Sequence, residues 1–312
     1  MALRTRPLHP LFGVEIEGVD VRRLDDAAFA EVVRLFEDHS VLLFRGQTLA
    51  DDDQIAFSER FGPLEATIRT VVSQARYRPE ISNLANVDAE DQLIPAGDTR
   101  NLFNAGNQMW HTDSSFKRVP AHASLLAARE VPPVGGETEW ASMRVAYECL
   151  SPERQRQLEG KVAIHSFEWS RGLIADGLMP AEHAAQVPPV PQALVRANPV
   201  HGRKSLYVAS HACEIVGMPT AEARALIHEL LDLATRRELV YTHRWEVGDL
   251  VMWDNRCTLH RGRPWDEGRY RRVMHRTTVA GDGPSAEAPL GYAVTPASAA
   301  DVAWGRAQLV TI

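Results

Sequence analysis

The sequence predicts a mainly β protein with inserted helices, built on a double-stranded β-helix, or jelly-roll, core. Two observations support this fold class. Short runs of strand-forming residues are dispersed along the whole chain, and segments with apolar residues at helical spacing lie between them. Such an arrangement is typical of two packed sheets that carry helical insertions.

Strands are expected where apolar residues alternate or form a short buried run. The run Ser40–Phe44 is short and apolar, whereas Arg272–Val279 alternates. The other expected strands are Ala123–Arg129, Glu137–Ala141, Leu239–Trp245 and Asp249–Trp253. Residues 131–136, which are rich in proline and glycine, predict the turn that joins two of them.

Helices are predicted from apolar residues that recur every three or four positions. The clearest is Thr220–Thr235, in which leucine, isoleucine and alanine form one stripe. Residues Asp26–Asp38 show the same spacing. The remaining expected helices are Asp51–Phe61, Ser142–Leu150 and Ser151–Leu158, the last with a serine N-cap and a proline at its first position.

We expect residues 1–312 to form one domain, because the chain shows no repeat and no low-complexity linker. The segment from about 72 to 108 carries little periodic signal, so it is either disordered or a functional lid. Because it ends at the metal motif described below, we favour an active-site lid. The segment from about 282 is expected to be a variable tail.

The formal net charge of −7 argues against a nucleic-acid partner, which needs a basic footprint. The basic cluster Arg269, Arg271, Arg272 and Arg276 is better suited to a small organic anion. No apolar run approaches the ~20 residues that span a bilayer, so no membrane partner is expected. A homo-oligomer is expected. The three cysteines are widely spaced and odd in number, which favours a reducing cytoplasm over a disulfide framework.

His111 and Asp113 flank Thr112, and His260 lies far along the chain beside a glycine. Two imidazoles and one carboxylate can occupy one face of a six-coordinate Fe(II), which leaves three positions for a keto acid and O₂. The triplet by itself is weak, because 12 histidines and 41 acidic residues would produce about one or two such triplets by chance. A surface histidine and aspartate that only solvate a loop are the alternative.

Arg272 and Arg276 are four residues apart on one expected strand and therefore share a face. Buried guanidinium groups are costly unless each meets an anion. The alternative is an exposed arginine row paired with Asp266 or Glu267.

Three segments together resemble the taurine dioxygenase/TfdA family of Fe(II)- and 2-oxoglutarate-dependent dioxygenases. They are residues 107–116 around the metal motif, the turn 131–138, and residues 248–260 with the second histidine. The resemblance runs from the first residues to about Gly281 and is nearest to the 2,4-dichlorophenoxyacetate dioxygenase branch.

The resemblance implies a role for each matching residue. His111, Asp113 and His260 would bind iron, and Arg272 with Thr138 would hold the distal carboxylate of 2-oxoglutarate. Arg276 would face the substrate anion, with Asn107 and Arg69 as further contacts and Trp253 as a wall of the iron pocket. The implied reaction is hydroxylation of an aryloxyalkanoate with O₂, followed by ether cleavage to a phenol and a keto acid.

Two alternatives stay open at this point. Another branch of the same family would hydroxylate a sulfonate or a different carboxylate, although residues 65–70 lack the histidine and tyrosine of the taurine enzyme. A noncatalytic jelly-roll that binds a metal or a carboxylate is the alternative from a different class.

Overall fold

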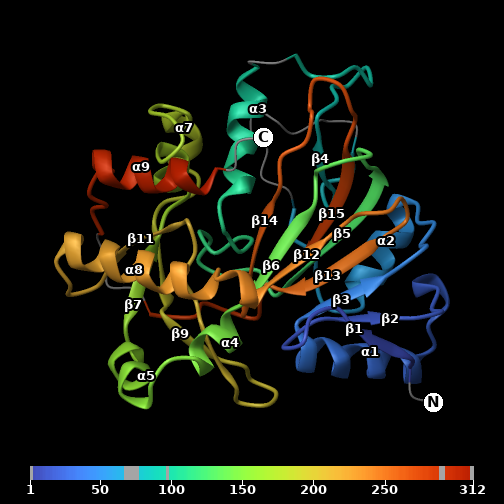
Figure 1. Cartoon of the computed structure of the whole chain (residues 1–312), viewed down its shortest axis with the longest axis horizontal. Coiled ribbons are helices and arrows are strands. Elements are labelled where there is room, and N and C mark those ends of the chain that lie inside the picture. The colour runs from blue at the N-terminus through green and yellow to red at the C-terminus, as the bar shows by residue number, and fades with distance from the viewer. Residues whose placement is uncertain (1–2, 67–76, 96–97, 288–291, 310–312) are drawn as a thin grey trace.

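A seven-stranded sheet forms the larger half of the core in the computed structural model, which describes residues 3–66, 77–95, 98–287 and 292–309. Its strands lie in the order β1 (Thr5–Pro7), β2 (Val14–Ile16), β3 (Val41–Phe44), β13 (Leu250–Asp254), β5 (Ala123–Glu130), β15 (Val273–Val279) and β4 (Ser82–Ala85) (Figure 1). A three-stranded sheet packs against it, in the order β12 (Val240–His243), β6 (Thr138–Ser142) and β14 (Thr258–Gly262). The predicted jelly-roll core is confirmed.

Large apolar side chains fill the space between these two sheets. Trp253 from β13 and Trp140 from β6 meet with their ring centroids 5.6 Å apart, and both are buried. Leu126 of β5 and Met274 of β15 belong to the same cluster. These side chains therefore pack the inner faces of the two sheets against each other, next to the strands that carry the predicted site residues.

The opposite face of the larger sheet is covered by helices α1 (Asp26–His39) and α2 (Asp51–Glu59). Phe36 of α1 and Phe57 of α2 pack in one cluster with Phe44 of β3. Asp25 caps α1 by accepting a hydrogen bond from the backbone N–H of Ala28 at 2.8 Å. These helices leave only the inner face of the sheet for a site.

The remaining helices and small sheets gather on the other side of the molecule, on the left of Figure 1. The small sheets contain β11 (Ala212–Ile215), β7 (Val162–His165) and β8 (Val190–Ala193), and β10 (Lys204–Leu206) with β9 (Val195–Ala197). The helices are α3 (Thr99–Asn104), α4 (Met143–Glu148), α5 (Pro152–Leu158), α6 (Phe167–Gly172), α7 (Ala181–Ala184), α8 (Thr220–Ala234) and α9 (Ala299–Gln308). The short 3₁₀ turns are η2 (Ala105–Gln108), η3 (Arg237–Leu239) and η1 (Val21–Arg23), of which η1 packs with α1 and α2 instead.

The C-terminal segment docks on the body of the protein through α9. Arg224 of α8 donates to Asp301 at 2.7 Å, and Trp304 stacks on His228 with ring centroids 3.8 Å apart. No helix among the described residues is long and apolar enough to cross a membrane.

Each strand and helix predicted above is present, with ends that differ by a few residues. The segment 72–108 is more regular than expected in its described part. It contributes β4, which pairs with β15, and then α3 and η2, which lead into the metal motif. His260 lies inside β14.

Candidate metal centre and cosubstrate pocket

His111, Asp113 and His260 converge although 149 positions separate the two histidines along the chain. The backbone of His111 pairs with that of His260 through two N–H···O bonds of 3.0 and 2.8 Å. One ligand atom from each side chain lies within 4.8 Å of the other two. Because Asp113 follows His111 by two residues, its carboxylate reaches the same side. We call these three residues the ligand cluster.

Hydrogen bonds and burial prepare the imidazoles for a cation. The Nδ1 atom of His111 lies 2.8 Å from the backbone oxygen of Met109, which fixes its proton there and leaves Nε2 free to bind a metal. The Nε2 atom of His260 lies 3.8 Å from Oδ2 of Asp113. Burial lowers the pKa of both histidines, so both rings are neutral and can donate an electron pair.

Asp113 is held as a carboxylate despite its burial. Burial alone would raise its pKa, but the guanidinium of Arg276 and the hydrogen bond from Ser124 hold the pKa of the carboxyl well below its ordinary value. Arg276 donates from Nη1 to Oδ1 at 2.5 Å, and Ser124 donates from Oγ to Oδ2 at 2.7 Å. The donor set of two neutral imidazoles and one carboxylate therefore fits a divalent metal such as Fe(II).

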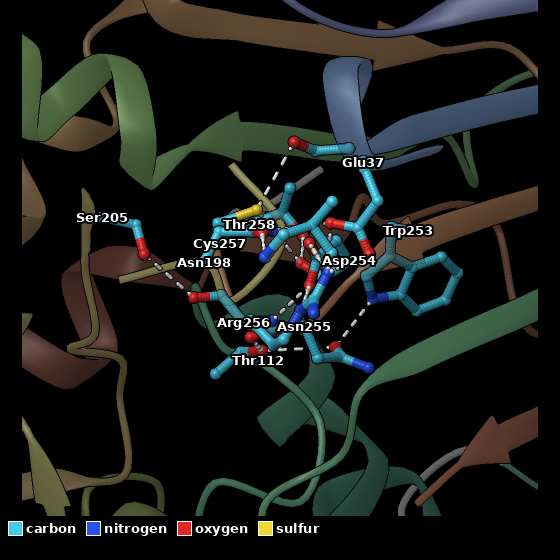
Figure 2. Close-up of polar contacts among 12 residues, drawn as sticks. Glu37, Thr112, Asn198, Ser205, Trp253, Asp254, Asn255, Arg256, Cys257 and Thr258 are labelled. Carbon is cyan, nitrogen blue, oxygen red and sulfur yellow. Dashed lines mark hydrogen bonds and ion pairs between the residues drawn. The ribbon is translucent and has the colours of Figure 1, made fainter. Parts of the chain in front are cut away.

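Asn255 connects the ligand cluster to the strand before β14. Its Oδ1 accepts hydrogen bonds from the backbone N–H of Asp113 at 3.2 Å and from the indole of Trp253 at 2.9 Å. Its Nδ2 donates to Ser124 at 2.9 Å, and Thr112 donates to its backbone oxygen at 2.8 Å; Figure 2 shows Asn255 between Trp253 and Thr112. Sequence reasoning missed Asn255 and Ser124 as site residues, because only the folded chain brings them to Asp113.

A cavity adjoins the ligand cluster between the two sheets. It is lined by His111, His260 and most of the other predicted site residues, namely Asn107, Thr138, Trp253, Arg272 and Arg276. The structure thus brings together residues from η2, β6, β13, β14 and β15. Arg69 lies outside the described residues.

Arg272 enters this cavity as a buried cation. Its Nε donates to the backbone oxygen of Gly136 at 3.1 Å, and its guanidinium lies over the ring of Trp265 at 5.2 Å. A Cβ on Gly136 would lie 3.1 Å from Cδ of Arg272, so the glycine leaves room for the side chain. Burial lowers the pKa of Arg272 to about 10, and Glu267 and Glu137 only partly compensate. The geometry suits an external carboxylate.

Thr138 lines the same cavity, and its hydroxyl can donate a hydrogen bond to a ligand there. Its Oγ1 accepts a hydrogen bond from the indole N–H of Trp245 at 2.9 Å, and the residue is buried. Because the oxygen is already an acceptor, its own O–H can be donated to a ligand beside Arg272.

Comparison with known proteins agrees with this geometry. The profile of "Taurine catabolism dioxygenase TauD, TfdA family" matches residues 4–278. The chain belongs to the TauD/TfdA family. The predicted family and the predicted dioxygenase class are therefore confirmed. The match ends before α9, so the C-terminal helix lies outside the part shared with the family profile.

Among its relatives is an alpha-ketoglutarate-dependent 2,4-dichlorophenoxyacetate dioxygenase of Cupriavidus pinatubonensis, 43% identical over 89% of this chain and 98% of that protein. An (S)-phenoxypropionate/alpha-ketoglutarate-dioxygenase of Sphingobium herbicidovorans is 35% identical over 92% of this chain and 97% of that protein. The crystal structure of AAD-2 in complex with Mn(II) and N-oxalylglycine has a TM-score of 0.84 and 39% identity, and the match covers 92% of this chain and 100% of that chain.

Proposed function

We propose that this TauD/TfdA-family enzyme binds Fe(II) through His111, Asp113 and His260 and uses 2-oxoglutarate and O₂ to hydroxylate an aryloxyalkanoate. The observation that carries the proposal is that one cavity joins the ligand cluster to the buried Arg272, whose charge is only partly balanced by described carboxylates. A metal or carboxylate store would have no need for both. Fe(II) in this position would couple oxidative decarboxylation of the keto acid to hydroxylation of the organic substrate.

The residues of this chain hold and orient the cosubstrate. Arg272 offers a planar fork to the distal carboxylate of 2-oxoglutarate, and the hydroxyl of Thr138 donates to the same group. The keto-acid end then faces the ligand cluster. Trp253 and Trp140, both buried, exclude water from the floor of the site.

Residues on the same cavity suit an organic anion with an apolar body. Arg276 supplies a cation next to Asp113, Asn107 supplies an amide, and Trp253 supplies an apolar wall. An aryloxyalkanoate has one carboxylate and a hydrophobic ring, and burial of the ring contributes about 25 cal/mol per Å². Hydroxylation of the carbon that bears the ether oxygen produces a hemiacetal, which collapses to a phenol and a keto acid.

We also propose a single catalytic domain, in which the α3–η2 part of the segment 72–108 acts as the lid and residues from about 282 form a variable tail. The position of Asn107 on the cavity supports the lid. Three free thiols, those of Cys149, Cys213 and Cys257, support the cytoplasmic location. The homo-oligomer stays a prediction.

Product analysis tests the proposal. The purified enzyme with Fe(II), ascorbate and 2-oxoglutarate is expected to release a phenol from phenoxyacetate or phenoxypropionate, with one succinate formed per phenol. Taurine is expected to yield little or no sulfite. Sulfite without phenol would move the substrate to the sulfonate class, and no substrate-dependent succinate with any anion would refute an enzymatic role.

A further inference from the structure

Four arginines are buried in the part of the chain that the structure describes: Arg144, Arg171, Arg224 and Arg272. Two of them meet carboxylates of the protein. Arg144 pairs with Asp254 at 3.2 Å and Arg224 with Asp301 at 2.7 Å. Arg171 and Arg272 form no ion pair with any described residue, and Arg272 is the group already assigned to 2-oxoglutarate. Arg171 is therefore a second buried cation that lacks an anion.

The guanidinium of Arg171 is surrounded by Phe103, Gly106 and Phe167, which we call the socket. Its Cζ is 4.5 Å from the ring centroid of Phe167 and 4.8 Å from that of Phe103. A Cβ on Gly106 would lie only 2.0 Å from Nη1 of Arg171. The glycine at position 106 therefore makes room for the guanidinium. Only 5% of Arg171 is exposed, and its Nε has no hydrogen-bond partner among the described residues.

The socket lies next to the ligand cluster, on the side of α6 and η2. Phe167 contacts His211 with ring centroids 5.7 Å apart, and His211 in turn contacts the metal ligand His111 at 6.3 Å. Gly106 directly precedes Asn107, which lines the cosubstrate cavity.

We propose that Arg171 binds the carboxylate of the organic substrate. The inference rests on the proposed function, because that reaction brings two anionic molecules to one metal centre. The two buried guanidinium groups that form no ion pair with a described residue match the two anions, Arg272 for 2-oxoglutarate and Arg171 for the substrate. Arg276 faces the same region, but its charge is largely balanced by Asp113.

A buried charge that has no counter-charge lowers the stability of the folded protein. Burial lowers the pKa of Arg171 to about 10, and no carboxylate among the described residues opposes that effect. Stacking on Phe103 and Phe167 recovers part of the cost and orients the planar fork. A carboxylate ligand would complete the compensation, and the aromatic rings would pack against its apolar body.

Steady-state kinetics of Arg171→Gln test the proposal. With phenoxyacetate as substrate and saturating 2-oxoglutarate, the KM for phenoxyacetate is expected to rise about tenfold or more, because a charge-assisted hydrogen bond is lost. The KM for 2-oxoglutarate is expected to change less than about twofold. Arg171→Lys, which keeps the charge, should lie between wild type and Arg171→Gln. Arg196→Gln is the matched control, since Arg196 also stacks on an aromatic ring, that of Tyr207 at 4.6 Å.

Equilibrium binding separates a ligand contact from a structural role. Under anaerobic conditions, phenoxyacetate and the neutral 2-phenoxyethanol are titrated into enzyme loaded with Fe(II) and 2-oxoglutarate, and the change in visible absorption is recorded. Arg171→Gln is expected to lose affinity for phenoxyacetate and to keep its affinity for 2-phenoxyethanol. Arg171→Met, without ligands, is expected to melt at the wild-type temperature or above it, because a buried charge has been removed.

Two outcomes would overturn the role of Arg171: an unchanged KM for phenoxyacetate, or equal losses of affinity for the charged and the neutral compound. Failure of the proposed function looks different. In that case the wild-type enzyme itself would show no 2-oxoglutarate-dependent turnover with any aryloxyalkanoate.

Discussion

The guanidinium of Arg276 donates a hydrogen bond to the carboxylate of Asp113, with Nη1 and Oδ1 2.5 Å apart. The arginine of β15 is thereby coupled directly to one member of the ligand cluster. Arg276 holds the pKa of Asp113 below its ordinary value against the effect of burial, so the carboxylate stays ionised and able to bind a metal at acidic pH.

Arg276→Gln is expected to make the metal site more sensitive to acid. Without the guanidinium the pKa of Asp113 rises, so protons compete with Fe(II) at a higher pH than in the wild type. The measurement is iron retention between pH 7 and pH 4, with the KM for the organic substrate as a second readout, which is expected to rise. Arg203→Gln is the control, because that arginine pairs with Glu148 on the surface. An unchanged acid midpoint would show that the hydrogen bond does not control Asp113.

Arg272→Lys keeps the positive charge but loses the planar fork. We expect the KM for 2-oxoglutarate to rise by about tenfold, since a charged hydrogen bond is worth roughly 1.5–3 kcal/mol. The KM for the organic substrate should change little. Kinetics with each compound varied in turn check this division, and a parallel rise in both KM values would mean that the two anions share one site.

Asn255→Ala is expected to lower iron affinity or kcat by about 10- to 100-fold, because hydrogen bonds from neighbouring residues orient the side chains that bind a metal. Asn198→Ala is the matched control: Asn198 is also buried, but it donates to Glu37 at 2.6 Å and has no contact with Asp113. Figure 2 shows both asparagines in the same region. Equal effects of the two substitutions on iron binding would contradict the role of Asn255.

Asp254 lies between Arg144 and Arg256 and is fully buried. Asp254→Asn leaves those two cations partly uncompensated, so the free energy of unfolding should fall by about 3–5 kcal/mol. Urea denaturation measures this change. Glu229→Gln, which removes the exposed partner of Arg154, should cost about 1 kcal/mol or less. Similar losses from both substitutions would show that burial of the Asp254 network adds nothing.

His165 predicts a pH dependence of stability. Burial lowers the pKa of its imidazole from the ordinary 6.5 to about 3. Between pH 3 and pH 6.5 His165 binds a proton in the unfolded chain but not in the folded chain. The free energy of unfolding therefore falls as the pH drops below about 6.5, by up to about 1.4 kcal/mol per pH unit. His165→Gln should flatten this slope in denaturation curves recorded from pH 7 to pH 4. An identical slope in the variant would contradict the assignment.

The spacing of apolar residues within single segments was sufficient to predict much of the fold. The stripe of α8 and the apolar run of β13 are legible in the sequence, because each buries one continuous face. The strands β14 and β4 were missed, since Thr258–Gly262 and Ser82–Ala85 contain few apolar residues and gain their stability from pairing with β6 and β15. Such pairing is not visible in a single segment.

The predicted site residues lie in short sequence motifs that resemble those of a known family. His111 and Asp113 form a motif, and the structure places His260 beside them. Arg144 and Arg171 look alike in the sequence, yet one meets Asp254 and the other has no described carboxylate partner. That difference depends on tertiary packing, as do the contacts of Asn255 with Asp113.

We propose that His111, Asp113 and His260 hold Fe(II) in a form that chelates 2-oxoglutarate. Anaerobic absorption spectroscopy detects this chelate. The wild-type protein with Fe(II) and 2-oxoglutarate is expected to develop the weak visible charge-transfer band of this chelate, and His111→Ala, Asp113→Ala and His260→Ala are each expected to lack it. If the band is absent in the wild type, or persists in any of the three variants, these three residues do not hold an Fe(II)–2-oxoglutarate chelate.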